Sequence, residues 1–177
     1  MVKIAKLCYK CKMLVILHNI RSLHNVGSIF RTADAAGVEK IYLCGYTPAP
    51  VDEMGRPRQP LAKVSLGAEK TIAWEKVNPH TRRGVGVKST TTIIKKLKKE
   101  GYKILAVEQD KKSVPYNQVK IKPREKVALV MGAEIEGVPK PILKNCDNIL
   151  EIPMRGKKES LNVAVAFGII IFRIVDK

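Results

Sequence analysis

Short apolar runs alternate along the chain with segments whose apolar positions recur at helical spacing. The runs with strand character, rich in Val, Ile and Leu, cover residues 13–17, 40–44, 102–107, 126–131 and 148–152. The helical patterns cover residues 26–36, 89–100, 139–145 and 161–175. Strands that alternate with helices are typical of an α/β domain, so we predict a mainly parallel sheet with helices on both faces.

Two segments between these elements have a clear local signal. Residues 46–60 contain four prolines and a glycine among scattered charges, which predicts a long surface loop. Ser89 is placed to cap the helix that follows it, and Gly101 is placed to end that helix. His18 and His24 are interpreted as surface or cap residues, because no nucleophile lies near either of them in the sequence.

The helix predicted over residues 161–175 is apolar on nearly every side. One face of a sheet cannot cover an apolar surface of that extent. Either the helix is enclosed within the subunit, or its outer face packs against a second copy of the chain. In a domain of this size the second alternative is favoured, so we predict a homodimer that packs through this helix.

The charge balance of the chain indicates what kind of partner it binds. The chain has 33 Lys and Arg against 16 Asp and Glu, a formal net charge of +17. Such an excess attracts polyanions, which favours nucleic-acid binding, although a lysine-rich composition alone produces the same excess. Charge does not distinguish RNA from DNA.

The length of 177 residues fits one domain, 1–177, with residues 1–12 as a short N-terminal extension. The longest apolar run, residues 163–172, is about half as long as a membrane-spanning helix requires. The N-terminal residues include no apolar stretch of signal-peptide length, so we expect a cytoplasmic protein without a membrane partner.

The four cysteines do not indicate a metal site. Cys8 and Cys11 form one C-x-x-C pair, but a zinc site requires a second close pair that the sequence lacks. Cys44 ends an apolar run and is interpreted as a small buried apolar residue. No metal is expected, and the role of Cys8 and Cys11 stays open.

Three polar loops follow predicted strands, where open α/β sheets bind their ligands. In the first loop, residues 19–34, Ser22 or Asn25 can cap the next helix. The guanidinium of Arg31 can bind a phosphate with two hydrogen bonds. The alternative is that Arg31 is a solvated helix residue paired with Asp34, three positions further on.

The second loop, residues 130–139, has two glycines five positions apart, as a P-loop has. Val138 and Pro139 stand where a P-loop has Lys and Ser or Thr, so a nucleoside triphosphatase is disfavoured. The glycine pattern of Rossmann dinucleotide-binding proteins is also missing after every predicted strand. Glu134 can cap a helix or pair with a base.

The third loop, residues 152–163, leads into the apolar helix. Ser160 is a good N-cap residue. Asn162 lies in the first turn of that helix, and its amide needs hydrogen-bond partners if it is buried. Arg155, Lys157 and Lys158 either form a solvated tip or contact phosphate.

Together these loops resemble the three signature motifs of the SpoU (TrmH-like) family of RNA ribose methyltransferases, within the SPOUT superfamily. Residues 25–37 (NVGSIFRTADAAG) are similar to motif one, residues 129–134 (LVMGAE) to motif two, and residues 152–154 (IPM) with 160–163 (SLNV) to motif three. The motifs have the same order and matching intervals. Residues 65–69 (SLGAE) are similar as well, so the resemblance covers nearly everything after Met13.

The resemblance implies a deep trefoil knot near the C-terminus, with S-adenosylmethionine bound in the knot, and a homodimer packed through the last helix. It implies transfer of a methyl group to a ribose 2′-hydroxyl of tRNA or rRNA. The implied cofactor-binding residues, which act largely through their backbone, are Met131, Gly132, Ile152, Met154 and Leu161. The implied catalytic residues are Arg31, Glu134, Ser160 and Asn162.

The residues expected to bind RNA are Arg21, Asn25, Arg31, Arg155, Lys157 and Lys158. Because an arginine is almost never neutral in a protein, we interpret Arg31 as a clamp on the neighbouring phosphate that orients the hydroxyl. A phosphate oxygen or a water then accepts the proton. Two alternatives stay open: a non-catalytic RNA-binding or assembly factor with the same fold, and a knotted methyltransferase that acts on an RNA base.

Overall fold

The structure of the chain is a computed structural model that describes residues 12–77 and 87–175. Its strands are β1 (Lys12–His18), β2 (Lys40–Cys44), β3 (Ala73–Val77), β4 (Lys103–Val107), β5 (Val114–Pro115), β6 (Lys126–Met131) and β7 (Asn148–Glu151). Its helices are α1 (Leu23–Ala35), α2 (Gln59–Ser65), α3 (Ala68–Thr71), α4 (Val87–Lys99), α5 (Lys140–Leu143) and α6 (Val163–Val175).

The strands form one sheet in the order β3-β2-β1-β6-β4-β7-β5, and each neighbouring pair runs parallel. The central strands are buried on both faces, as the continuous apolar runs of β1 and β6 require. The chain moves outward from β1 to β3 and then returns to the other side of β1, where β6 pairs with it. The loops that follow β1 and β6 therefore lie side by side at the carboxyl edge of the sheet.

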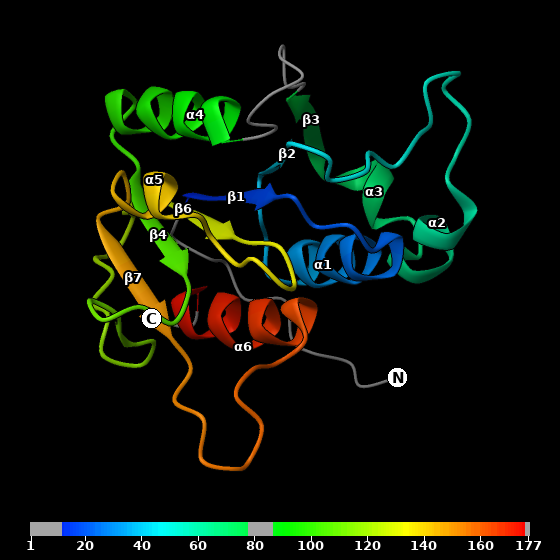
Figure 1. Ribbon diagram of the computed structural model, residues 1–177. Helices are drawn as coiled ribbons and strands as arrows, with labels where there is room; N and C mark the ends of the chain where they lie inside the picture. Colours follow the sequence, from blue (N-terminus) through cyan, green and yellow to red (C-terminus); the bar gives the residue numbers. More distant parts are fainter. Residues whose placement is uncertain (1–11, 78–86, 176–177) are drawn as a thin grey trace.

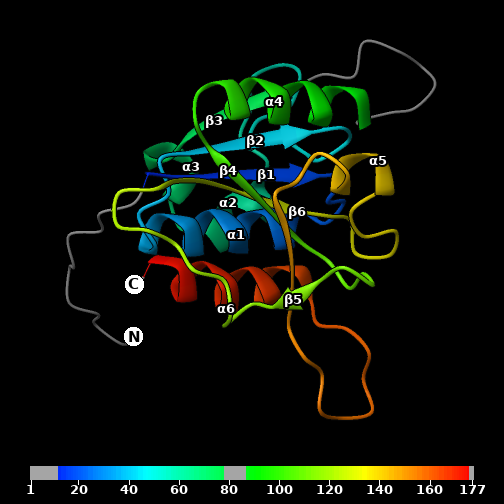
Figure 2. The same ribbon diagram turned by 90° about the vertical axis from the view of Figure 1, so that its left-hand side faces the viewer.

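Helices cover both faces of the sheet, which confirms that part of the sequence prediction (Figure 1). Helices α1 and α6 supply Phe30 and Phe167 to the core on one face. Helices α4 and α5 supply Leu97 and Ile142 to the core on the other face. Figure 2 shows the two layers from the side, with α1 and α6 below the strands and α4 above them.

Four short elements were not predicted, namely α2, α3, β3 and β5. Helix α3 has four residues and β5 has two, which is too short for periodicity to show. Strand β3 is an edge strand whose side chains are exposed or half-buried, so it lacks an apolar run.

All four predicted helices start one to three residues away from their predicted positions, and at α4 and α6 the difference changes the predicted cap. Helix α4 begins at Val87, so Ser89 lies inside its first turn and is not its cap. Helix α6 begins at Val163, because the carbonyl oxygen of the Asn162 side chain accepts a hydrogen bond from Ala164 N at 2.9 Å. Asn162, and not Ser160, is therefore the N-cap of α6.

Cys44 is fully buried in the second core, as predicted for a small apolar residue, and burial raises the pKa of its thiol to about 11. Cys8 and Cys11 lie outside the described residues. Within the part of the chain that the structure describes, no helix is long and apolar enough to span a bilayer.

Candidate functional site

The polar loops predicted from the sequence meet at the carboxyl edge of the sheet. They follow β1, β6 and β7, which end at His18, Met131 and Glu151. Because all three strands belong to one parallel sheet, their carboxyl ends lie at the same edge. Segments more than a hundred residues apart in the chain thereby become neighbours.

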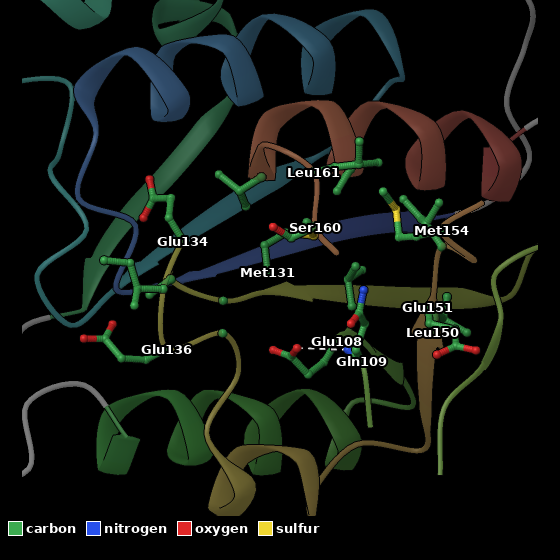
Figure 3. A pocket seen from close by; sticks show the side chains of 18 residues that line it. Glu108, Gln109, Met131, Glu134, Glu136, Leu150, Glu151, Met154, Ser160 and Leu161 are labelled. Atoms are coloured by element: carbon green, nitrogen blue, oxygen red, sulfur yellow. Dashed lines mark hydrogen bonds between the residues drawn. The ribbon is translucent and has the colours of Figure 1, made fainter. Parts of the chain in front are cut away.

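A cavity of about 290 Å³ lies between the turn after β6, the segment after β7 and the start of α6 (Figure 3). Its volume is near the lower end of small-molecule sites, which span roughly 300 to 1,000 Å³. Seven residues singled out from the sequence line it: Met131, Gly132, Glu134, Ile152, Met154, Ser160 and Leu161. All five residues implied to bind the cofactor therefore face one cavity.

The turn after β6 is closed by two backbone hydrogen bonds, from Ala133 N to Gly137 O at 3.2 Å and from Gly137 N to Ala133 O at 2.9 Å. This closure brings the backbone of Gly137 against Gly132, and a Cβ atom at Gly132 would overlap it. Gly137 has a φ of +61°, which favours glycine. Both glycines of the second loop are thus required by the shape of the turn.

Glu108 connects this turn to the neighbouring strand β4 by a hydrogen bond. The sequence patterns above do not point to this residue. It directly follows β4, and its Oε2 accepts a hydrogen bond from Val138 N at 2.6 Å. Its Oε1 accepts from Gln109 N at 2.9 Å. The available signal was a carboxylate at the carboxyl end of a buried strand, the same position that identified the three loops.

We expect the variant Gly132→Ala to be destabilised by about 1–3 kcal/mol, because the new Cβ would overlap backbone atoms that cannot move away. For a protein of this size that is a fall of roughly 2–12 °C in Tm. Thermal unfolding followed by circular dichroism measures it. Gly156→Ala is the matched control, since a Cβ atom at Gly156 has open space around it, and an equal fall in both variants would contradict the proposed overlap.

The cavity is acidic although the protein is strongly basic. Four carboxylates line it, those of Glu108, Glu134, Glu136 and Glu151, and among the described residues no Lys or Arg does. Figure 3 shows Glu134 and Glu136 at one end of the cavity and Glu151 at the other. Such a lining attracts a cation and repels a phosphate, so the cavity is suited to a ligand that carries positive charge.

Hydrogen bonds between side chains join the three loops at one end of the cavity. The amide of Asn25 donates to Glu134 Oε1 at 2.8 Å, and the amide of Asn162 donates to Asn25 Oδ1 at 3.1 Å. Glu134 Oε2 also accepts from Arg21 N at 3.4 Å. Each loop thus contributes one side chain to this hydrogen-bonded series, and each side chain is oriented by the others.

The capping alternatives are decided by these contacts. Ser22 is the N-cap of α1, since its hydroxyl accepts a hydrogen bond from Asn25 N at 3.2 Å. That leaves the Asn25 side chain free to bind Glu134 and Asn162. The Ser160 side chain is exposed, lines the cavity and makes no hydrogen bond within the described residues.

Arg31 lies on the exposed side of α1 and is not among the residues that line the cavity. Within residues 12–77 and 87–175 it makes no hydrogen bond or ion pair. The alternative that pairs it with Asp34 is wrong, because Asp34 Oδ1 instead accepts a hydrogen bond from Thr71 at 2.8 Å. Helix α1 packs beside α6, so Arg31 is carried on a helix next to the apolar face of α6.

The cations of the third loop, Arg155, Lys157 and Lys158, are exposed between β7 and α6. None of them lines the cavity. Figure 1 shows this loop projecting away from the body of the sheet. Arg21 is also exposed, and its guanidinium is 3.4 Å from Glu136 Oε1.

His18 is buried, with 1% of its surface exposed, so its interpretation as a surface or cap residue is wrong. Its Nδ1 is 2.9 Å from the hydroxyl of Thr90 on α4, and its Nε2 has no hydrogen-bond partner within the described residues. Burial lowers its pKa to about 4, while Glu136 opposes this shift. His18 is therefore neutral at pH 7 and links the central strand to α4. His24 is exposed, as expected.

This lowered pKa predicts a pH dependence of stability. A histidine with a lowered folded-state pKa is protonated more readily in the unfolded chain, so its contribution is present above pH 6.5 and is lost as the pH falls toward 4. The expected loss is roughly 3 kcal/mol. Urea unfolding between pH 4 and 7 measures it, with His18→Gln as the comparison. An equal pH dependence in both proteins would contradict this prediction.

Comparison with known proteins identifies the family of the chain. The sequence model of the SpoU rRNA Methylase family matches residues 12–172. The 23S rRNA (guanosine-2′-O-)-methyltransferase RlmB of Ralstonia nicotianae is 31% identical over 163 residues, and RlmB of Escherichia coli K12 is 32% identical over 162 residues. Each match covers 92% of this chain, which spans 58% and 59% of the length of these relatives.

The solved structures with the same fold include two that are 29% identical to this chain. The AdoMet-bound rRNA methyltransferase from Sinorhizobium meliloti has a TM-score of 0.77 at 29% identity, covering 92% of this chain and 55% of its own. The TrmH/SpoU tRNA modifying enzyme of A. aeolicus has a TM-score of 0.75 at 29% identity, covering 95% of this chain and 77% of its own.

Proposed function

Because the chain belongs to the SpoU rRNA Methylase family, we propose that it transfers a methyl group from S-adenosylmethionine to a ribose 2′-hydroxyl of RNA. The observation that carries the proposal is the hydrogen-bonded series Glu134, Asn25 and Asn162 beside an acidic cavity. Relatives named for the same reaction on guanosine of 23S rRNA support it, and either rRNA or tRNA is the expected substrate class.

The acidic cavity fits S-adenosylmethionine, whose sulfonium and ammonium groups are both positively charged. When bound, this cofactor supplies an activated methyl group. Backbone groups of the turn after β6 and of Ile152 and Leu161 would hold its adenosyl part, with Met131 and Met154 against it. Gly132 keeps the turn narrow, so the backbone of the turn stays beside the cavity.

Glu134 and Asn162 act in this proposal as positioning residues. Their hydrogen bonds to Asn25 hold the end of the cavity rigid, and a rigid site lowers the barrier of a transfer that depends on alignment. The free hydroxyl of Ser160 faces the cavity and is available to the substrate. Arg31 binds the phosphate next to the target ribose and orients its hydroxyl, while a phosphate oxygen or a water accepts the proton.

The RNA backbone would contact polar and positively charged side chains outside the cavity. Arg21 and Asn25, from the first loop, line a hollow beside the cavity. Arg155, Lys157 and Lys158 are exposed on the third loop. Cations outside the cavity and carboxylates inside it separate the two ligands by charge. Phosphates are attracted to the exterior, and the cationic cofactor is attracted to the interior.

The proposal includes a homodimer and a trefoil knot. Val165, with 51% of its surface exposed, and Ile169, with 37%, lie on the outer face of α6, and Leu161 is exposed at its start. An exposed apolar stripe on an otherwise buried helix supports a contact with a second copy. The family resemblance is the basis for the knot, which would bring the segments 131–137 and 150–163 around one cofactor.

Incubation with radiolabelled S-adenosylmethionine and total RNA, followed by digestion to nucleosides, tests the proposed function. A label on a 2′-O-methylnucleoside is the expected result. A label on a base would replace the proposal by base methylation. No label, with RNA still bound, would identify a non-catalytic RNA-binding factor.

A further inference from the structure

A second hollow, of about 370 Å³, adjoins the cavity described above. Arg21, Ser22 and Asn25 form one side of it, and residues 133–136 form the other. Residues 133–136 also line the first cavity, so a single turn of the chain separates the two hollows. The bonded pair Asn25 and Glu134 stands at this shared wall.

The turn between the hollows presents an apolar side chain that has no role in packing. Ile135 is 87% exposed, although it lies between two glutamates at the tip of the turn. An isolated apolar side chain at the edge of an RNA-directed site is suited to contact with the face of a base. The hollow that it borders is therefore suited to a planar, partly apolar ligand.

A guanidinium held in place lies near the opposite side of this hollow. The Arg21 guanidinium carbon is 5.1 Å from the centre of the Tyr46 ring, and its Nη2 donates to the Tyr46 hydroxyl at 3.3 Å. The same Nη2 is 3.4 Å from Glu136 Oε1. These contacts place the Arg21 guanidinium beside the hollow, where it is a second surface on which a base can stack.

Glu136 supplies the polar group of the hollow. Arg21 contacts its Oε1, while its Oε2 accepts no hydrogen bond within residues 12–77 and 87–175. A carboxylate only accepts hydrogen bonds. Guanine has two adjacent donors on its Watson–Crick edge, N1–H and the N2 amino group, whereas adenine, cytosine and uracil have one donor position on theirs. A carboxylate in this hollow is complementary to guanine.

We propose that the second hollow binds the base of the target nucleotide and that Glu136 selects guanine through its N1–H and N2 amino donors. This rests on the proposed function, because the base site is meaningful only beside a ribose methyltransfer site. A base in the second hollow would place its attached ribose at the wall formed by Asn25 and Glu134. That wall faces the cavity assigned to the cofactor.

The first test measures binding and does not require activity. Guanosine 5′-monophosphate and inosine 5′-monophosphate differ only in the N2 amino group, so their comparison isolates one hydrogen bond. In NMR titrations of the full chain with methyl-labelled isoleucine, we expect the guanine nucleotide to shift the Ile135 methyl signal. The inosine nucleotide should bind roughly tenfold or more weakly, as expected for loss of a hydrogen bond to a charged group. Equal binding, or no shift at Ile135, would overturn the proposal.

The second test changes the recognition group. In Glu136→Gln the carboxamide offers one donor and one acceptor, so it no longer matches the two donors of guanine. We expect formation of 2′-O-methylguanosine in RNA to fall at least tenfold, and the guanine over inosine preference to disappear. Glu100→Gln, the same chemical change at the residue that follows α4, at the other edge of the sheet, is the matched control and should leave both unchanged.

The two proposals fail separately. Absence of any methylated nucleoside would contradict the proposed function, while the nucleotide titration would still decide whether the hollow binds guanine. A wild-type protein that methylates adenosine, cytidine or uridine in preference would overturn the base site alone. Calorimetric titration of Glu136→Gln with S-adenosylmethionine separates the effects, because Glu136 also lines the first cavity. A loss of cofactor affinity equal to the loss of methylation would contradict a role in base selection.

Discussion

Replacing Arg31 by alanine lowers the rate of RNA methylation by about a hundredfold to a thousandfold, the loss expected when one positioned cationic donor is removed from a reaction site. The fold should be unaffected. Arg31 is exposed and makes no hydrogen bond or ion pair within the described residues, so the free energy of unfolding should change by less than about 0.5 kcal/mol. Single-turnover methylation and thermal unfolding measure the two effects.

Arg124→Ala is the matched control for this variant. Arg124 is exposed and precedes β6, at the end of the sheet opposite the cavity, so its loss should leave methylation unchanged. Affinity for S-adenosylmethionine should also be unchanged in Arg31→Ala, because Arg31 does not line the cofactor cavity. Retained methylation in a well-folded Arg31→Ala protein would remove the assignment.

Arg31 does not line the cofactor cavity of its own chain, although the proposed function requires it beside the reacting ribose. In the proposed dimer, α6 faces the second copy and α1 lies beside it, so Arg31 would act on the cavity of the partner. Mixing Arg31→Ala with Glu134→Ala chains tests this. Mixed dimers would contain one site with both residues intact, and activity should return. If Arg31 acts within its own chain, the mixture stays inactive.

The second large effect is on the oligomeric state. We expect the wild-type chain to be dimeric and the double variant Val165→Asp with Ile169→Asp to be monomeric, because each carboxylate would lose its hydration in an apolar interface. A penalty of several kcal/mol raises the Kd of the dimer by about a thousandfold or more. Sedimentation equilibrium measures the mass of each protein.

Met54→Asp is the control for this change, since Met54 is an exposed apolar residue on the loop before α2 and not on α6. It should leave the dimer intact. Methylation should fall together with dimer formation if Arg31 acts across the interface. A wild-type protein that is monomeric at micromolar concentration, or a double variant that remains dimeric, would contradict the role of α6.

The sequence was sufficient for the elements whose residues are buried on both faces of the sheet. The predicted strands 40–44 and 126–131 agree with β2 and β6 at every residue. Continuous apolar runs of that length have few alternatives in a parallel sheet. The edge strand β3 and the short helices α2 and α3 were missed, because half-exposed elements carry no such pattern.

The same distinction between local and long-range information applies to the site. The loops of the site, and the residues in them that line the cavity, could be chosen from their position after strands and from the family motifs. The hydrogen-bond partners of these residues could not be predicted from the sequence. Asn25 bonds to Glu134 and Asn162, which are 109 and 137 positions away, and Glu108 bonds to Val138 across 30 positions.

What the sequence determined by itself was the alternation of strands and helices, the positions of the three loops and the excess of positive charge. Only the tertiary structure decided that β6 lies beside β1, that His18 is buried, and that Arg31 stands outside the cavity. The physical reason is that local patterns record which side chains must avoid water. They do not record which distant segment covers them, and that depends on the order of the strands.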